Sequence, residues 1–227
     1  MIRRFLLALL LAMPAAAQEV PPAAPPPAEA PRPATVEVVM TTEAGPITIA
    51  LETQRAPITA GYILKHVDEK RLDGATFYRA YKVTPDGSIA LIQGGIRDGA
   101  KLLPPVAHEP TTVTGLSNTD GAVSLARGAP GTAQAQFFII MGNLSSLDAN
   151  PQAPGDNLGF AVFGHVSAGM DVVRKILESP LSATKGDGAM KGQMIEVPVK
   201  ILSVKRVIPL PPRPVPVAVK KPAARKR

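Results

Sequence analysis

A period of two in hydrophobicity runs through residues 35–207, and it limits the fold more than any other feature of this sequence. Val36, Val38 and Met40 alternate with other residues, a turn follows at 43–46, and the alternation resumes over 47–51. Successive side chains on a strand point to opposite faces, so this pattern predicts a β-hairpin. Similar runs between clusters of Gly, Pro, Asp and Asn predict six further strands: 76–83, 89–94, 121–126, 136–141, 160–166 and 197–207.

Helical spacing of apolar residues occurs in two places within the same region. A first helix is predicted to begin at Pro57, with Ala60, Ile63 and Val67 on one face, and a second is predicted over 170–178. Strands that follow one another without intervening helices cannot form parallel crossovers, so they pair antiparallel. About eight short strands with two helices therefore predict a mainly β domain, either an antiparallel barrel or a sandwich.

The two ends of the chain have compositions that do not build a packed core. Residues 1–17 join a basic head to a short apolar run and three consecutive alanines, which is the layout of a secretory signal peptide cleaved before Gln18. Residues 18–34 are a Pro/Ala-rich linker, which we expect to be an extended spacer. Residues 208–227 are a Pro-rich basic tail, which we expect to be disordered. One domain, residues 35–207, lies between these segments.

The signal-like segment predicts export from the cytoplasm, and we expect the periplasm as the destination. Its apolar run is much shorter than the roughly 20 residues that a membrane span needs. The alternatives are an uncleaved anchor and a buried N-terminal helix.

The net charge of +7 is concentrated in the terminal segments. The tail contains six basic residues and no acidic residue, and the signal-like segment contains two arginines. Without these eight, residues 5–207 contain 17 basic and 18 acidic residues. The folded part is therefore not basic, which argues against a nucleic-acid partner. The tail is either a solvating segment or a weak electrostatic contact with an anionic envelope.

The residue inventory excludes several kinds of site. The sequence contains no cysteine, so disulfide frameworks, thiolate metal sites and cysteine nucleophiles are excluded. It contains three histidines, which we expect to be helix, loop and strand residues without a catalytic role. We expect neither a metal nor a cofactor.

Five separated motifs stand in order between about residues 36 and 207: Phe77-Tyr78-Arg79, Ile92-Gln93-Gly94-Gly95, the segment 121–127, Gln136-Phe137-Phe138-Ile139 and the segment 161–166. Together they closely resemble the cyclophilin family of peptidyl-prolyl cis–trans isomerases, and most of all its exported bacterial branch. The family implies a closed eight-stranded antiparallel barrel capped by two α-helices, in agreement with the independent strand count.

The resemblance also implies the function: faster rotation about Xaa–Pro bonds and assistance to the folding of exported proteins, by non-covalent stabilisation of the transition state. Proline-containing polypeptides are the implied partners, and we expect a monomer. A catalytically weak peptide-binding or chaperone module of the cell envelope is the alternative.

Matching the family's motifs residue by residue gives the candidate site. Arg79 is the implied catalytic cation, with Gln93 beside it to orient the arginine and bind substrate backbone. Phe138 is the implied floor of a pocket for the proline ring. The implied substrate-binding residues are Leu91, Ala126, Arg127, Gln136, Leu147 and Phe160.

Some positions depart from the family pattern. Ala90 occupies the place of a pocket phenylalanine, so one pocket wall is expected to be missing unless Tyr81 fills it. Ser146 replaces a tryptophan that many eukaryotic relatives carry. Two insertions are expected, at about 82–88 and 150–157, the second at the rim of the substrate groove. These changes bear on substrate preference more than on the fold.

Overall fold

The computed structural model describes residues 34–207. The predicted signal peptide, all of the predicted linker except residue 34, and the predicted tail lie outside the described residues. Within residues 34–207, no helix is both long enough and apolar enough to cross a membrane.

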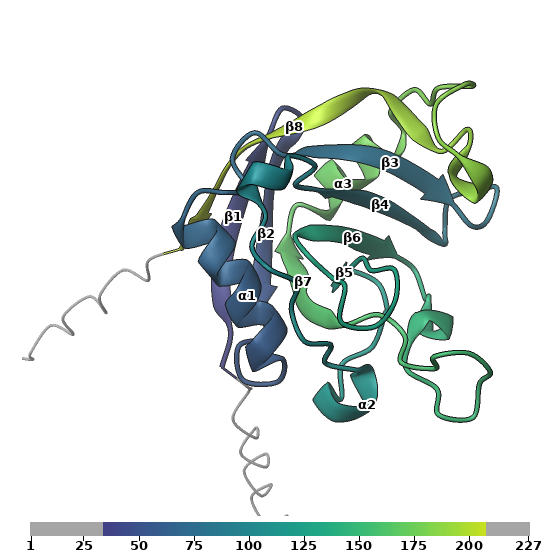
Figure 1. The fold of residues 1–227 in the computed structure, drawn as a ribbon. Coiled ribbons are helices and arrows are strands. Elements are labelled where there is room, and N and C mark those ends of the chain that lie inside the picture. The colour runs from purple at the N-terminus through teal and green to yellow at the C-terminus, as the bar shows by residue number, and fades with distance from the viewer. Residues whose placement is uncertain (1–33, 208–227) are drawn as a thin grey trace, which may run out of the picture. The chain divides into compact units, whose positions relative to one another are not determined.

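Eight strands in the described residues close into one antiparallel barrel, in the order β1-β2-β7-β5-β6-β4-β3-β8 (Figure 1). The barrel confirms the predicted fold class, and each predicted strand overlaps an observed one. The longest strand, β8, begins three residues earlier than predicted. The strands are β1 (Val36–Thr42), β2 (Gly45–Leu51), β3 (Thr76–Lys82), β4 (Ala90–Gly95), β5 (Ala122–Leu125), β6 (Gln136–Met141), β7 (Val162–Ala168) and β8 (Met194–Arg206).

Three α-helices lie in the described residues, one more than the sequence predicted. The predicted pair are α1 (Pro57–Asp68) and α3 (Met170–Leu177), and the additional helix is α2 (Thr111–Thr114). A helix of four residues is too short to show a helical period, so its sequence gave no signal. Three short 3₁₀ turns complete the elements: η1 (Gly99–Lys101), η2 (Ser145–Leu147) and η3 (Gly188–Met190).

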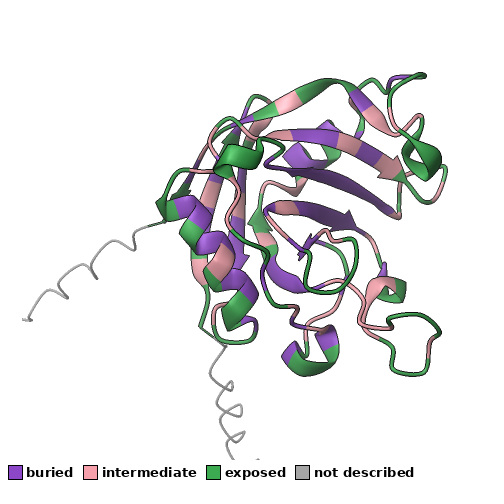
Figure 2. Cartoon of the chain, viewed as in Figure 1, coloured by how far each residue is buried: buried purple, intermediate pink, exposed green. Residues whose placement is uncertain are grey.

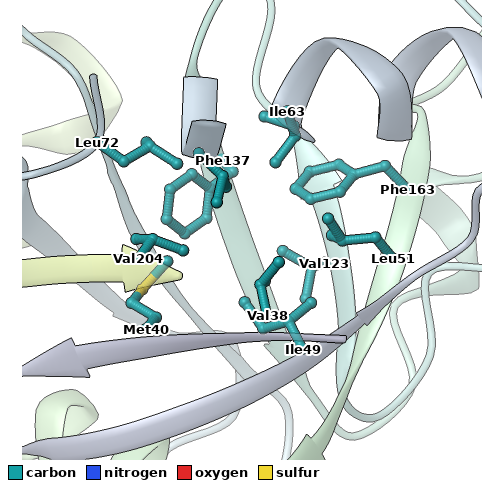
Figure 3. Close-up of a pocket in the computed structure, with 11 residues that line it drawn as sticks. Val38, Met40, Ile49, Leu51, Ile63, Leu72, Val123, Phe137, Phe163 and Val204 are labelled. Carbon is teal, nitrogen blue, oxygen red and sulfur yellow. The ribbon is translucent and has the colours of Figure 1, made fainter. Parts of the chain in front are cut away.

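The barrel interior is a filled hydrophobic core to which both α1 and α3 contribute (Figure 2). Phe77, Phe137 and Phe163 lie in it. A cavity of about 10 Å³ lies within this core, lined by apolar residues such as Val38, Leu51 and Phe137 (Figure 3). A space of this size holds at most about one water molecule. The barrel core is therefore closely packed at this point and has no room there for a ligand.

The first turn of α1 is stabilised by a residue from a distant loop. Pro57 occupies the first turn, where its missing N–H costs nothing. The buried carboxylate of Glu109 accepts hydrogen bonds from the backbone N–H groups of Ile58 and Thr59. A negative charge at this end also complements the helix dipole.

His66 is fully buried on α1. Its Nδ1 lies 2.9 Å from the Tyr62 carbonyl oxygen, so Nδ1 carries the proton of the neutral ring. Among the described residues, its Nε2 has no hydrogen-bond partner. Burial lowers the pKa of His66 below its ordinary value, and the nearby cations Arg71 and Lys65 act in the same direction.

We predict that this histidine makes the barrel sensitive to mild acid. The folded-state pKa of His66 lies below that of the unfolded chain, about 6.5. As the pH falls below this value, the unfolded state binds the proton first, so the free energy of unfolding decreases. Urea unfolding at pH 7.5, 6.5 and 5.5 should show a shallower decline for His66→Gln than for the wild type. Equal declines of the free energy of unfolding in the two proteins would show that His66 does not contribute to the sensitivity to acid.

Candidate active site on the outer wall of the barrel

Three of the predicted site residues form one row across neighbouring strands. Arg79 on β3 pairs with Gln93 on β4, and Gln93 pairs with Phe138 on β6. A register shift on β3 between Phe77 and Arg79 leaves Tyr78 as the extra residue. Such a bulge re-aims the side chains that follow it. Strand pairing thereby places Arg79 and Phe138, which lie 14 and 45 positions from Gln93 in the sequence, on either side of Gln93.

The Arg79 guanidinium is held from two sides. Its Nη1 donates to Gln93 Oε1 at 2.8 Å, while Nε and Nη2 donate to Gln193 Oε1 at 2.9 and 2.6 Å. Its carbon lies 5.4 Å from the centre of the Tyr81 ring, which adds a cation–π contact. Partial burial lowers the pKa of Arg79, but an arginine stays charged at any physiological pH. The site therefore presents a fixed positive charge.

An apolar cluster, separate from the barrel core, lies beside this arginine on the outer wall of the barrel. The Phe138 ring is 4 % exposed and forms the base of the cluster. It meets Phe160 edge-on, with ring centres 5.4 Å apart. We call this set the outer apolar cluster. Its buried members are Leu91, Ala122, Phe138, Ile140, Leu144 and Val162, and its partly buried members include Tyr81, Ala126, Leu147 and Phe160.

A polar pocket of about 240 Å³ adjoins the same row of residues. Gln93 lines this pocket as well as pairing with Arg79 and Phe138, so the pocket and the outer apolar cluster share a border. The Gln136 side chain is fixed by the Tyr78 hydroxyl, which donates to Gln136 Oε1 at 2.8 Å. The full lining is Gln93, Ala126, Arg127, Gly128, Thr132, Gln134, Gln136 and Met190.

The Arg127 side chain is engaged within the protein. Its terminal nitrogens donate to both carboxylate oxygens of Asp156 at 2.8 Å, and its Nε donates to the Gly159 carbonyl oxygen. The guanidinium carbon also lies 5.5 Å from the centre of the Phe160 ring. The side chain is only 6 % exposed. Arg127 therefore reaches the pocket mainly through its backbone, and its side chain fastens the 150–157 loop to the wall of the outer apolar cluster.

Loss of this ion pair should weaken substrate binding without altering the chemistry. Arg127 holds the pKa of Asp156 well below its usual range, at about 2, so the pair is intact at neutral pH and is lost only as the pH falls toward 2. We expect Asp156→Asn to raise KM about two- to fivefold with kcat unchanged. Asp68→Asn removes a similar two-contact pair, with Arg206, outside the site. An equal change of KM in Asp156→Asn and Asp68→Asn, measured by steady-state kinetics, would contradict a role of the Arg127–Asp156 pair in substrate binding.

One expectation from the sequence, the missing pocket wall at Ala90, changes in the structure. Ala90 is fully buried and belongs to the barrel-core cluster, so its small side chain does not remove a wall of the outer apolar cluster. Strand alternation explains this, because Leu91 is the residue of β4 that reaches the outer cluster. Tyr81 pairs with Leu91 and packs against the same cluster.

All nine predicted site residues lie on this part of the barrel wall, but sequence reasoning missed others. Gln193 and Met190 come from the loop before β8, more than 100 positions from Arg79. No local pattern signalled them, because this loop reaches Arg79 only through the pairing of β3 with β8.

This geometry defines the class of site. A fixed cation borders an apolar surface on one side and a polar pocket on the other, which suits an extended peptide with an apolar ring next to a polar backbone.

Comparison with known proteins identifies the family. The family model for "Cyclophilin type peptidyl-prolyl cis-trans isomerase/CLD" matches residues 37–206. A peptidyl-prolyl cis-trans isomerase of Acinetobacter baylyi is 36% identical over 174 residues, covering 74% of this chain and 84% of that protein. Peptidyl-prolyl cis-trans isomerase A of Dickeya dadantii is 34% identical over 145 residues, covering 61% and 70%. The chain belongs to the cyclophilin-type peptidyl-prolyl cis–trans isomerase family and is an enzyme of that activity.

Solved structures support the fold. A cyclophilin-type peptidyl-prolyl cis-trans isomerase of Cryptosporidium parvum aligns with a TM-score of 0.58 at 16% identity, covering 78% of this chain and all of that one. A second structure of that protein, in the presence of the dipeptide Ala-Pro, gives a TM-score of 0.56 at 16% identity and covers 76% and 99%. Family membership favours the isomerase over the catalytically weak peptide-binding alternative.

Proposed function

We propose that this isomerase acts on Xaa–Pro bonds in extended segments of exported polypeptides, with Arg79, Gln93 and Phe138 as its central residues. The observation that carries the proposal is the position of the Arg79 guanidinium, fixed at the border of the outer apolar cluster. Cis–trans isomerisation of peptidyl-prolyl bonds is the activity of the family, and the residue roles that follow are our assignments.

The chemistry needs a donor at the prolyl nitrogen. Rotation about an Xaa–Pro bond passes a twisted state that lacks amide resonance, against a barrier of about 18–20 kcal/mol. The nitrogen then regains a lone pair, which the Arg79 cation stabilises more in the twisted state than in the planar one. A turnover near 10²–10³ s⁻¹ needs only about 6–7 kcal/mol of such stabilisation.

The neighbouring residues hold the peptide around that bond. The proline ring packs on Phe138, with Leu91, Leu147 and Phe160 beside it in the same cluster. The Oε1 atoms of Gln93 and Gln136 already accept hydrogen bonds from the protein, so their NH₂ groups remain to donate to substrate carbonyls. The backbone of Ala126 and Arg127 borders the polar pocket and contacts the adjoining residues of the peptide.

Exchange NMR on a short peptide with one Ala–Pro bond tests these assignments. We expect the protein to accelerate cis–trans exchange and the peptide to shift backbone signals of Gln93, Ala126 and Phe138. Acceleration with shifts confined to another face of the barrel would reject the site while leaving the family activity intact.

We further propose that the enzyme works outside the cytoplasm as a folding assistant. Support comes from the signal-like residues 1–17 and the flanking linker, both outside the described residues. Mass spectrometry of the protein from a Gram-negative host should find a mature N-terminus at Gln18 in the periplasmic fraction. An unprocessed chain that stays in the cytoplasm would overturn this proposal.

The basic tail is proposed to be a solvating segment, with weak attraction to anionic envelope as the competing assignment. Truncation after residue 207 should leave envelope association unchanged at low salt. Lost association in the truncated protein would favour the electrostatic role instead.

A further inference from the structure

The side chain of Gln193 is the second support of Arg79, on the side opposite Gln93. One oxygen, Gln193 Oε1, accepts from both Nε and Nη2 of the arginine, at 2.9 and 2.6 Å. Gln93 accepts from Nη1. A guanidinium carries five N–H donors, so these three bonds leave one N–H on each terminal nitrogen. The two glutamines thus fix the plane of the group and leave donors free for a substrate.

The orientation of the Gln193 amide is itself determined by the fold. Its Nε2 donates to the Ala189 carbonyl oxygen in η3 at 2.7 Å, so its Oε1 must face Arg79. Its backbone N–H donates to the Met190 carbonyl oxygen at 3.0 Å, which closes the turn from which Gln193 projects. The carbonyl group of Gln193 accepts from the Ala80 N–H on β3 at 3.0 Å. The acceptor is therefore held rigidly against the strand that carries Arg79.

The neutrality of this acceptor matters for catalysis. A carboxylate in the same place would hold the arginine equally well but would neutralise the charge that the twisted amide nitrogen needs. A glutamine holds the guanidinium and leaves its full positive charge. The loop also contributes Met190 to the polar pocket, so one turn both positions the Arg79 guanidinium and lines the pocket.

We propose that Gln193 is a positioning residue of the isomerase, which acts through Arg79 and does not touch the substrate. The proposal rests on the catalytic role assigned to Arg79 above. Replacement should lower kcat about tenfold, because misplacement of a catalytic group is costly, and should leave KM within about twofold.

The experiment measures kcat and KM by exchange NMR for four variants of the full chain. Gln193→Ala removes the acceptor, and Gln193→Met removes it while keeping the side-chain length, in case the alanine variant folds poorly. Gln193→Glu keeps an acceptor but adds a charge, and should also lower kcat. Gln54→Ala is the control. Gln54 Oε1 accepts a hydrogen bond from the Ala34 N–H outside the site, so its removal should leave kcat unchanged.

A second readout follows the arginine directly. The Nε–H signal of Arg79 should exchange slowly with water in the wild type and in Gln193→Glu, and rapidly in Gln193→Ala and Gln193→Met. A purely structural role for Gln193 would change the melting temperature without changing this signal.

The double variant Arg79→Ala, Gln193→Ala separates failure of this proposal from failure of the catalytic assignment. If Gln193 acts through Arg79, the double variant is no slower than Arg79→Ala alone. Independent, multiplying losses would overturn the positioning role. An unchanged kcat in Gln193→Met, with the Arg79 signal in rapid exchange, would also overturn it. An Arg79→Ala variant with wild-type rate would instead reject the assignment on which it rests.

Discussion

Replacing Arg79 by alanine is expected to lower kcat/KM for an Ala–Pro peptide about 10²–10³-fold. A fixed donor aimed at developing charge is commonly worth this much in a site partly shielded from water. The side chain lies on the outer wall, does not belong to the hydrophobic core, and donates its hydrogen bonds to the buried Gln93 and the partly buried Gln193. Its loss therefore removes no core packing, and the variant should fold with a melting temperature close to that of the wild type.

Two further variants test whether the loss of rate is specific to the arginine at position 79. Arg79→Lys keeps the charge but not the planar fork that two glutamines hold from two sides, so it should lose most of the rate. Arg97→Ala is the matched control, because Arg97 stacks on Tyr78 at 5.1 Å much as Arg79 stacks on Tyr81. We expect it to stay within about threefold of the wild type. A folded Arg79→Ala variant with more than a third of the wild-type rate would contradict the assignment.

The barrel strands were predictable from the sequence because each is a local pattern. Alternation at 36–40 and 47–51 needs no knowledge of distant residues, and the observed hairpin pairs Val38 with Ile49 accordingly. The closed ring was not predictable from alternation alone, since the same pattern suits a sandwich. The resemblance to the family predicted a closed barrel, and in the structure the pairing of β1 with β8 closes it.

The site was predictable as a set of residue types, but not as a set of contacts. Arg79, Gln93 and Phe138 come from motifs in the chain, and strand register then puts them in one row. Gln193 was missed because its role depends on a loop of irregular backbone that no local period describes. The Arg127 side chain has a partner, Asp156, inside an insertion, so the family pattern gave no hint of it.

At Gly95 the backbone of β4 lies in close contact with the backbone at the start of β6, the strand that carries Gln136 of the polar pocket. It ends β4 with a φ of +128°, and its partner across the sheet is Gln136. An added Cβ would lie 2.2 Å from the Ala135 carbonyl oxygen and 2.7 Å from the Gln136 Cα. That same carbonyl accepts a hydrogen bond from the Ile96 N–H at 3.0 Å. Because the obstructing atoms belong to the backbone, a larger residue has to separate β4 from β6.

We therefore expect Gly95→Ala to lower the free energy of unfolding by about 2–5 kcal/mol, through overpacking together with an unfavourable φ. Gly61 provides the opposite control. It lies inside α1 with no atom within 4 Å of an added Cβ, so Gly61→Ala should raise the stability by about 0.5–1 kcal/mol. Urea unfolding at neutral pH measures both. If Gly95→Ala does not fold alone, its introduction into the Gly61→Ala background supplies additional stability for the measurement.

The same substitution predicts a change in activity that a general loss of stability would not produce. Displacement of β6 moves Gln136 away from Tyr78 and widens the polar pocket, which Gln93 and Gln136 both line. At a temperature where Gly95→Ala is still fully folded, KM should therefore rise several-fold while the Arg79 Nε–H signal stays protected. A folded variant with wild-type KM, or a free energy of unfolding within about 0.5 kcal/mol of the wild type, would show that β4 accommodates the methyl group without moving β6.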